Sequence, residues 1–278
     1  MMRVATQSSF ERGLSTLQRR QAELAEQQEQ LTSGKRVARA SDDPAAAARA
    51  ERAMAAKMRV DADQRALDAS RNAVLQAESA LGDAEELLQQ AREHVLAAGN
   101  ASYSDLERQG LAVAIRGLRE QLLSVANRGD GAGNYLFGGQ GSARAPFADG
   151  PFGVVFGGDG GSTMTANAQP LPLTVDGGTT WLKATDPDLG TDNLSVFDVL
   201  DRLAGELEAT GRSNDQITST VREGVKDLDA VADHLRSARS RLGETLNRAD
   251  AVEVRLSQQA LMASAEREWR RGREGDRR

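Results

Sequence analysis

The side chains that could take part in catalysis are few and widely spaced in this sequence of 278 residues. Only two histidines are present, His94 and His234, and neither has a second metal ligand three or four positions further on, as a metalloprotease helix requires. Acidic pairs stand at 42–43 and 85–86, but carboxylates that do acid–base chemistry need a concave, partly dry site. We therefore expect no catalytic residue and no metal site.

Two glycine-rich segments are the other candidates for chemistry, GGQG at 138–141 and GGDGG at 157–161. Neither has the GxGxxG or GxxxxGK[ST] spacing that brings backbone N–H groups to a phosphate at the start of a helix. We interpret both segments as turns, and we expect no cofactor and no enzymatic activity.

Composition restricts the partners of the chain. The formal net charge is −6, with a pI near 5.2, so the chain as a whole lacks the basic field that holds a nucleic acid. No apolar run approaches the length of a membrane span, and the first residues lack the order of a cleaved signal peptide. We expect no nucleic-acid partner, no membrane partner and no general secretory signal.

The elements that must position any functional side chain are long helices. Aromatic residues make up 4% of the chain and cysteine is absent, while Ala, Leu, Arg, Glu and Gln dominate both ends. Such a composition favours helices that pack through narrow apolar stripes and excludes disulfides.

A first apolar stripe begins near the N-terminus and has the alternating spacing of four and three that is typical of a coiled coil. Gln21 and Gln28 occupy two of its positions, and polar residues there lower stability in exchange for a defined register. The apolar members are Phe10, Leu14, Leu17, Leu24 and Leu31. We call these five residues the α-seam and predict that it is an assembly surface.

Two further stripes have strict seven-residue spacing and predict the packing of a helical rod. The first stripe lies on a helix predicted from about Pro44 to Ala98, which would be about 80 Å long. A capping box, Ser104 to Glu107, then predicts another helix that forms a hairpin with it. The rod-packing residues are Leu67, Val74, Leu81, Leu88, Val95, Leu228, Leu235 and Leu242.

The middle of the chain has a different composition. Residues 129–190 hold fifteen of the 27 glycines, five of the six prolines and four of the six phenylalanines. The short runs FGVVF, STMTANA and LPLTV stand between turn signals such as GGDGG and DGG, which is typical of a small sheet of hairpins.

These patterns together predict a mainly α fold: an elongated antiparallel bundle or coiled coil of long helices formed by both chain ends, with a small β-rich insert domain in the middle. The predicted parts are an N-terminal coiled-coil helix at 1–32, a linker at 33–44, a helical rod at 45–128, the insert at 129–193, the second half of the rod at 194–264, and a disordered arginine-rich tail at 265–278.

The segment LTSGKRVARASDDPAAAARA at 31–50 has the signals of a helix that stops and a new helix that starts. Glycine favours the position after a helix, basic side chains suit the preceding carbonyls, and Ser or Asp followed by Pro favours a helix start. A simple connector between two helices explains these signals locally. The residues concerned are Gly34, Lys35, Arg36, Ser41, Asp42, Asp43 and Pro44.

In this segment the sequence resembles the flagellin family. The resemblance rests on the L-[ST]-[ST]-G turn, here Leu31 to Gly34, on the basic link at 35–37, and on the [SA]-x-D-D restart at 41–43. The ending DDP, the start RVATQSSF and NYLFGG at 134–139 are more similar to the members that join the hook to the filament than to filament flagellin. The resemblance covers roughly residues 1–262. The residues at the entry to the insert are Tyr135, Leu136, Phe137, Gly138 and Gly139.

The resemblance implies a structural subunit of the extracellular flagellum that joins hook to filament by helical self-assembly. Both chain ends would form inner layers of a tube, the linker would join those layers, and the insert would face outward. Expected partners are copies of the chain, other axial proteins such as the other hook-associated protein and filament flagellin, and a flagellar export chaperone.

One difference from the family concerns the C-terminus. Family members normally end with another amphipathic helix that pairs with the N-terminal seam, whereas this sequence continues as AEREWRRGREGDRR. Truncation, a frameshift and divergence would each produce such a C-terminus, and the sequence is compatible with all three.

Other functions are compatible with the same patterns. Filament flagellin is the alternative within the family, and a coiled-coil binding adaptor, which would form a defined dimer with a soluble partner, is the alternative outside it. A hydrolase within the insert is a further alternative, and motility retained after substitution of every Asp in 149–192 would count against it.

Overall fold

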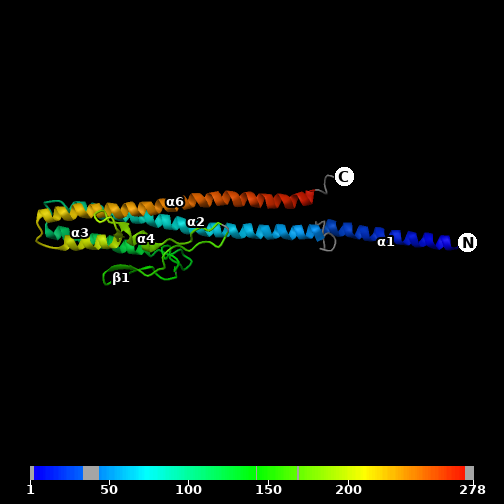
Figure 1. Cartoon of the computed structure of the whole chain (residues 1–278), viewed down its shortest axis with the longest axis horizontal. Helices are drawn as coiled ribbons and strands as arrows, with labels where there is room; N and C mark the ends of the chain where they lie inside the picture. The colour runs from blue at the N-terminus through cyan, green and yellow to red at the C-terminus, as the bar shows by residue number, and fades with distance from the viewer. Residues whose placement is uncertain (1–2, 34–43, 142, 168, 273–278) are drawn as a thin grey trace. The chain divides into compact units, whose positions relative to one another are not determined.

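The computed structural model describes residues 3–33, 44–141, 143–167 and 169–272. The long helices are α1 (Arg3–Ser33), α2 (Pro44–Ala98), α3 (Asp105–Ala126), α5 (Val196–Glu208) and α6 (Asn214–Gly272). Between α3 and α5 lie β1 (Phe147–Gly150), β2 (Gly153–Phe156), α4 (Gly177–Leu182), β3 (Ala184–Thr185) and β4 (Asp192–Leu194), as Figure 1 shows. The predicted fold class, mainly α with a small strand-containing insert, is confirmed.

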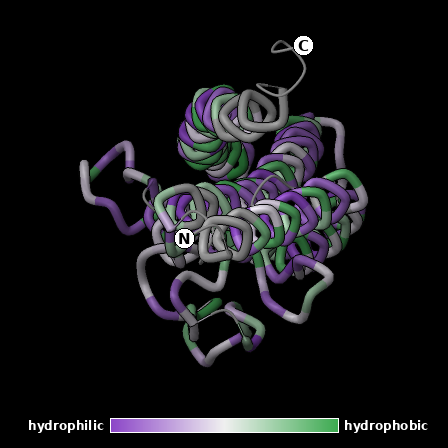
Figure 2. The backbone as a smooth tube through the Cα atoms, turned by 90° about the vertical axis from the view of Figure 1, so that its right-hand side faces the viewer, coloured by the Kyte–Doolittle hydropathy of each residue, from purple (hydrophilic) through white to green (hydrophobic). Residues whose placement is uncertain are grey.

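The chain divides into two compact units, one of residues 63–254 and one that combines 1–62 with 255–278. In the first unit the helices and the insert share a single apolar core. In Figure 1 the β1–β2 hairpin and α6 lie on opposite sides of α3, and Figure 2 looks along the helices with the loops of the insert outside them. The insert therefore packs as part of the helical unit and not as a separate globule.

The turn between α2 and α3 follows the predicted local chemistry. Ser104 caps α3 and forms the capping box with Glu107. The buried Arg108 donates to the carbonyl oxygens of Ala98 and Asn100, at 3.3 and 3.4 Å. The guanidinium thus satisfies the carbonyl group of Ala98, the last residue of α2, which has no partner within that helix.

Replacing Arg108 with Met should destabilise this turn. The substitution keeps much of the apolar stem but leaves the carbonyl of Ala98 unsatisfied, so the free energy of unfolding should fall by about 1–3 kcal/mol. Urea denaturation followed by far-UV circular dichroism measures the change. Gln121→Ala, an exposed change on the same helix, is the control, and equal stability of the two variants would contradict the role of Arg108.

The strands of the insert differ in part from the prediction. FGVVF contributes β2, which pairs antiparallel with β1 so that Phe147 lies opposite Phe156. STMTANA and LPLTV, however, form no strand in their described residues. They are joined by an isolated antiparallel bridge between Met164 and Pro172, with the N–H of Thr165 donating to Leu171 and that of Leu173 donating to Thr163. The N–H groups of Thr163 and Leu171 donate to threonine hydroxyls instead of to a continued ladder, so the prediction of two strands here is wrong.

Two helical segments also differ from the prediction. The DGG sequence at 176–178, predicted as a turn, starts α4, with Asp176 accepting a hydrogen bond from the Thr179 N–H at 3.1 Å. Gly177 lies so close to the carbonyl of Phe137 that a side chain there would collide with it. At the other end of the chain, α6 continues to Gly272, so residues 265–272 of the predicted disordered tail are helical, and the remainder lies outside the described residues.

Candidate assembly surfaces

His234 and the glycine-rich segments, which were considered for catalysis, have structural contacts in this fold. The Nε2 atom of His234 lies 2.9 Å from the carbonyl oxygen of Thr179 and so joins α6 to α4. The two glycine-rich segments contact each other, with the N–H of Gln140 donating to the carbonyl of Asp159 at 2.9 Å. Within the described ranges, no three His, Cys, Asp or Glu side chains form a group that could hold a metal ion. No described helix is long and apolar enough to cross a membrane.

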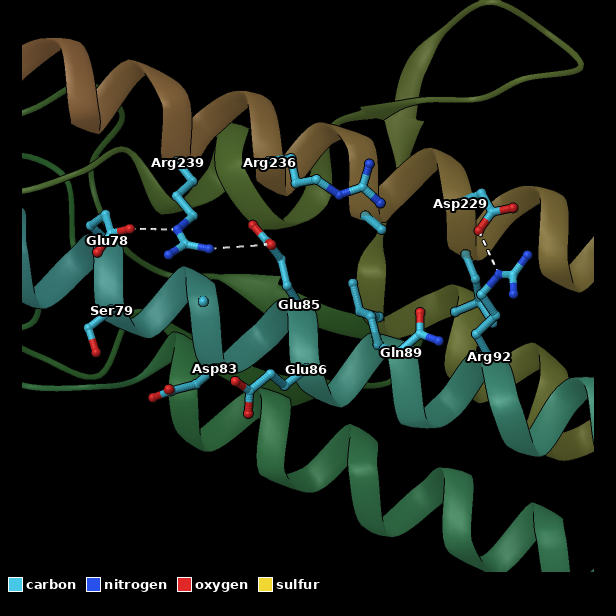
Figure 3. A pocket seen from close by; sticks show the side chains of 14 residues that line it. Glu78, Ser79, Asp83, Glu85, Glu86, Gln89, Arg92, Asp229, Arg236 and Arg239 are labelled. Atoms are coloured by element: carbon cyan, nitrogen blue, oxygen red, sulfur yellow. Dashed lines mark hydrogen bonds and ion pairs between the residues drawn. The ribbon is translucent and has the colours of Figure 1, made fainter.

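A groove of about 580 Å³ lies between α2 and α6 and is lined mainly by charged side chains (Figure 3). Arg239 donates to Glu78 at 2.6 Å and lies 3.5 Å from Glu85, while Arg92 donates to Asp229 at 2.9 Å. The carboxylates thus face arginines from the opposite helix. This arrangement fixes the register of α2 against α6.

Seven of the eight predicted rod-packing residues belong to the core cluster of residues 63–254, and Leu67 is buried outside that cluster. All eight are buried: Leu67, Val74, Leu81, Leu88, Val95, Leu228, Leu235 and Leu242. Alanines of α2 fill the positions between them, and small side chains there let helices approach closely. These residues therefore complete their contacts within one chain.

The α-seam has the opposite environment. Phe10, Leu14, Leu17, Leu24 and Leu31 are between 49% and 79% exposed. Every other described side chain of α1 is exposed as well. The seam therefore presents an apolar stripe about 30 Å long, at about 1.5 Å per residue, to whatever covers this helix.

The predicted inter-layer linker can be placed only at its end. Gly34, Lys35, Arg36, Ser41, Asp42 and Asp43 lie outside the described residues, whereas Pro44 is the first residue of α2. Proline suits the first turn of a helix because it lacks the N–H that would have no partner there. The proposed function of the linker stays a prediction.

The insert entry lies beside a cluster of aromatic side chains. Leu136, Phe137, Gly138 and Gly139 are buried and Tyr135 is half-buried. The ring centroids of Phe137 and Trp181 are 5.3 Å apart in an edge-to-face arrangement. Phe147 and Phe197 complete the cluster at centroid distances of 6.4 and 6.0 Å from Trp181. The sequence marks Trp181 only by the rarity of tryptophan, so its place in the cluster was not predicted.

Arg119 of α3 connects the hairpin to the helices, and no pattern in the sequence marks it. Its buried guanidinium forms ion pairs with Asp149 of β1 and with Asp201 of α5, the latter at 3.2 Å. It also lies 5.9 Å from the centre of the Phe197 ring. The hydrogen bond from Arg119 lowers the pKa of Asp149. One side chain thus holds three elements in place.

Replacing Arg119 with Met should loosen the hairpin and lower the free energy of unfolding by about 2–3 kcal/mol. This is less than the usual cost of breaking a fully buried ion pair, because both carboxylates are half-exposed. Arg116→Met on the same helix removes an ion pair with Glu208 in which both partners are half-exposed, and should cost less than about 1 kcal/mol. Equal losses in urea denaturation would contradict the role of Arg119.

The pH dependence of stability provides a second readout for Arg119. Because its folded pKa is lowered, the Asp149 carboxylate contributes stability at neutral pH that is lost as the pH falls through that value. The pKa of Asp198 is raised, first by burial and then by Asp201, so this carboxylate lowers stability at neutral pH and the loss disappears as the pH falls. In Arg119→Met the Asp149 contribution should disappear, so stability should fall less steeply below pH 5. An unchanged acid slope would contradict this assignment.

Comparison with known proteins agrees with the arrangement of helices. Residues 4–142 match the bacterial flagellin N-terminal helical region. Flagellar hook-associated protein 3 of Salmonella typhimurium is 28% identical over 270 residues, which cover 94% of this chain and 85% of that protein. Flagellar hook-associated protein 3 of Escherichia coli K12 is also 28% identical, over 269 residues with the same coverage.

Solved structures share the fold. A putative flagellar hook-associated protein from Vibrio parahaemolyticus has a TM-score of 0.71 at 20% identity, covering 82% of this chain and 98% of that one. Flagellar hook-associated protein 3 from Legionella pneumophila has a TM-score of 0.68 at 18% identity, covering 75% of this chain and 95% of that one.

Proposed function

The chain belongs to the bacterial flagellin family, and we propose that it is a structural, non-catalytic subunit of the flagellum that joins the hook to the filament by helical self-assembly. The two relatives named flagellar hook-associated protein 3, which match 94% of this chain, support the junction over the filament. Its location is the extracellular flagellum, reached without a cleaved signal peptide.

The contrast between the two kinds of apolar stripe carries the proposal. The rod-packing residues are buried within the chain, whereas the α-seam is exposed along the whole of its length. At about 25 cal/mol per Å² of apolar area removed from water, exposing such a stripe is unfavourable for an isolated subunit. Contacts with neighbouring subunits in a tube would cover it, which favours an assembling protein over a catalyst.

The partners follow from this role. Copies of the chain and other axial proteins, which include the other hook-associated protein and filament flagellin, would cover the α-seam in the assembled tube. A flagellar export chaperone would be a further partner before assembly. The predicted linker at 33–44 would join the layer formed by α1 to the layer formed by the rod.

Complementation tests the proposal. The chain is expressed in a motile bacterium that lacks its own hook-filament junction protein, and flagella are examined by electron microscopy. Filaments attached to hooks, with motility restored, are expected. Bare hooks with filament protein released into the medium would count against the junction role, provided that mass spectrometry finds the intact chain outside the cell.

The same experiment separates the alternatives. A strain that lacks filament flagellin but has its own junction protein is the matched control, and this chain should build no filament there. Long filaments in that strain would favour filament flagellin. A soluble heterodimer with no dependence on hook proteins would favour a coiled-coil adaptor.

A further inference from the structure

Two tripeptides of the sequence have the form Asn-x-Ser, with x not proline, to which N-linked sugars are attached. The turn motif is Asn100-Ala101-Ser102, between α2 and α3, and the cap motif is Asn193-Leu194-Ser195, at the start of α5. A tripeptide arises often by chance, so the surroundings of each motif must decide whether a transferase can use it. The structure gives the two motifs different surroundings.

The asparagine of the turn motif is held by the serine of the same motif. The Oδ1 atom of Asn100 accepts hydrogen bonds from the N–H and from the hydroxyl of Ser102, at 3.0 and 2.8 Å. Because a backbone N–H only donates, the atom that faces it is the amide oxygen, and the Nδ2 group is turned away from it. All three residues of the motif are exposed, and no described residue accepts a hydrogen bond from Nδ2.

The backbone of the turn motif is fixed although its side chains are open to solvent. The N–H of Asn100 donates to the carbonyl of Ala97 at 3.0 Å. The carbonyl of Asn100 accepts from the N–H of Tyr103 at 3.0 Å and from the guanidinium of Arg108 at 3.4 Å. A sugar on Nδ2 would therefore break none of the contacts that hold this turn.

The cap motif has its serine hydroxyl engaged elsewhere. Ser195 is only 5% exposed and caps α5, where its hydroxyl accepts from the N–H of Asp198 at 3.3 Å. The Oδ1 atom of Asn193 accepts instead from the hydroxyl of Thr191, at 2.8 Å. An enzyme that must contact the serine of its motif can reach this one only if α5 loses its cap.

We propose that Asn100 is an acceptor for an N-linked sugar and that Asn193 is not. The co-substrate is a hexose activated at C1 by a nucleoside diphosphate, and the enzyme is a transferase that recognises Asn-x-Ser. This inference goes beyond the proposed function and does not rest on the junction role, since it concerns the isolated chain.

The chemistry of the transfer uses the geometry of the turn motif. A base of the transferase takes one proton from Nδ2, the Nδ2–C1 bond forms, and the C1–O bond to the diphosphate breaks, so that the diphosphate leaves with the bonding electrons. As the proton departs, negative charge develops on Oδ1 of Asn100. The two donors of Ser102 already face that atom, and donors in place before the reaction stabilise such a charge.

Enzymatic glucosylation of the full-length chain tests the proposal. The folded protein is incubated with UDP-glucose and a soluble N-glycosyltransferase that modifies Asn-x-Ser and Asn-x-Thr, and mass spectrometry of the intact chain and of its peptides locates the hexose. We expect the sugar on Asn100. The rate at Asn193 should be lower by at least about tenfold, because modification there requires the cap of α5 to open.

Matched variants and a digest serve as controls. Asn100→Gln should abolish the addition, whereas Asn193→Gln should leave it unchanged. Ser102→Ala should also abolish it, and Ser102→Thr, which keeps a hydroxyl at the same position, should retain it. These sites are exposed, so circular dichroism should show the same helix content in every variant. In peptides from a digest of the chain both motifs should be modified, since the fold no longer covers the serine of the cap motif.

Three outcomes would overturn the proposal. One is a folded chain without sugar on Asn100 when the digest is modified at that residue. The others are equal rates at Asn100 and Asn193 in the folded chain, and addition that survives Ser102→Ala. The attachment of filaments to hooks is not part of any of these readouts, so the junction role stands or falls separately.

Discussion

Replacing Leu17 with Asp should abolish the attachment of filaments to hooks while leaving the isolated chain as stable as before. Leu17 lies in the α-seam and is 64% exposed, so the free energy of unfolding should change by less than about 0.5 kcal/mol. In an assembled layer the same position would be covered, and an unpaired carboxylate buried there would cost several kcal/mol. Motility of the complemented strain and the fraction of hooks with filaments measure the effect.

Ser15→Asp is the matched control. Successive residues of a helix are about 100° apart, so residues 15 and 17 point to opposite sides of α1, and both substitutions introduce one negative charge. Ser15→Asp should retain attachment. Normal attachment in both variants would show that the α-seam is not an assembly surface, and loss in both would show that the effect is one of charge and not of the seam.

The helices were predictable because their signals are local. Ser104 caps a helix at the position that the sequence indicates, since a cap is recognised within four residues. Leu67 and Leu228 are buried as their seven-residue spacing requires. A repeated spacing over many turns leaves one consistent face, and that face forms the core.

The insert was less predictable because its contacts are distant in the sequence. Phe147 begins a strand that depends on Phe156, and Trp181 contacts Phe197 sixteen positions later. Arg119 illustrates the limit for a functional side chain, because its partners Asp149 and Asp201 are 30 and 82 positions away. No spacing rule on α3 distinguishes it from Arg116. The α-seam, by contrast, is a local pattern and could be read directly.

The second large effect concerns Trp181, which is fully buried at the centre of the aromatic cluster. Trp181→Ala should lower the free energy of unfolding by about 3–5 kcal/mol, because a large cavity remains. The cluster belongs to the same core as α3 and α5, so the helices should unfold with the insert in one transition. Phe152→Ala removes an aromatic ring that is 99% exposed and should leave stability unchanged.

Trp181→Phe separates packing from hydrogen bonding at the same position. The indole Nε1 is buried without a hydrogen-bond partner among the described residues, and an unsatisfied donor costs about 1–3 kcal/mol. Phenylalanine loses some buried area but removes that donor, so Trp181→Phe should lie within about 1 kcal/mol of the original chain. Urea denaturation of the three variants, followed by far-UV circular dichroism, gives the order. A loss in Trp181→Phe as large as in Trp181→Ala would mean that the indole N–H contributes a hydrogen bond to the folded state.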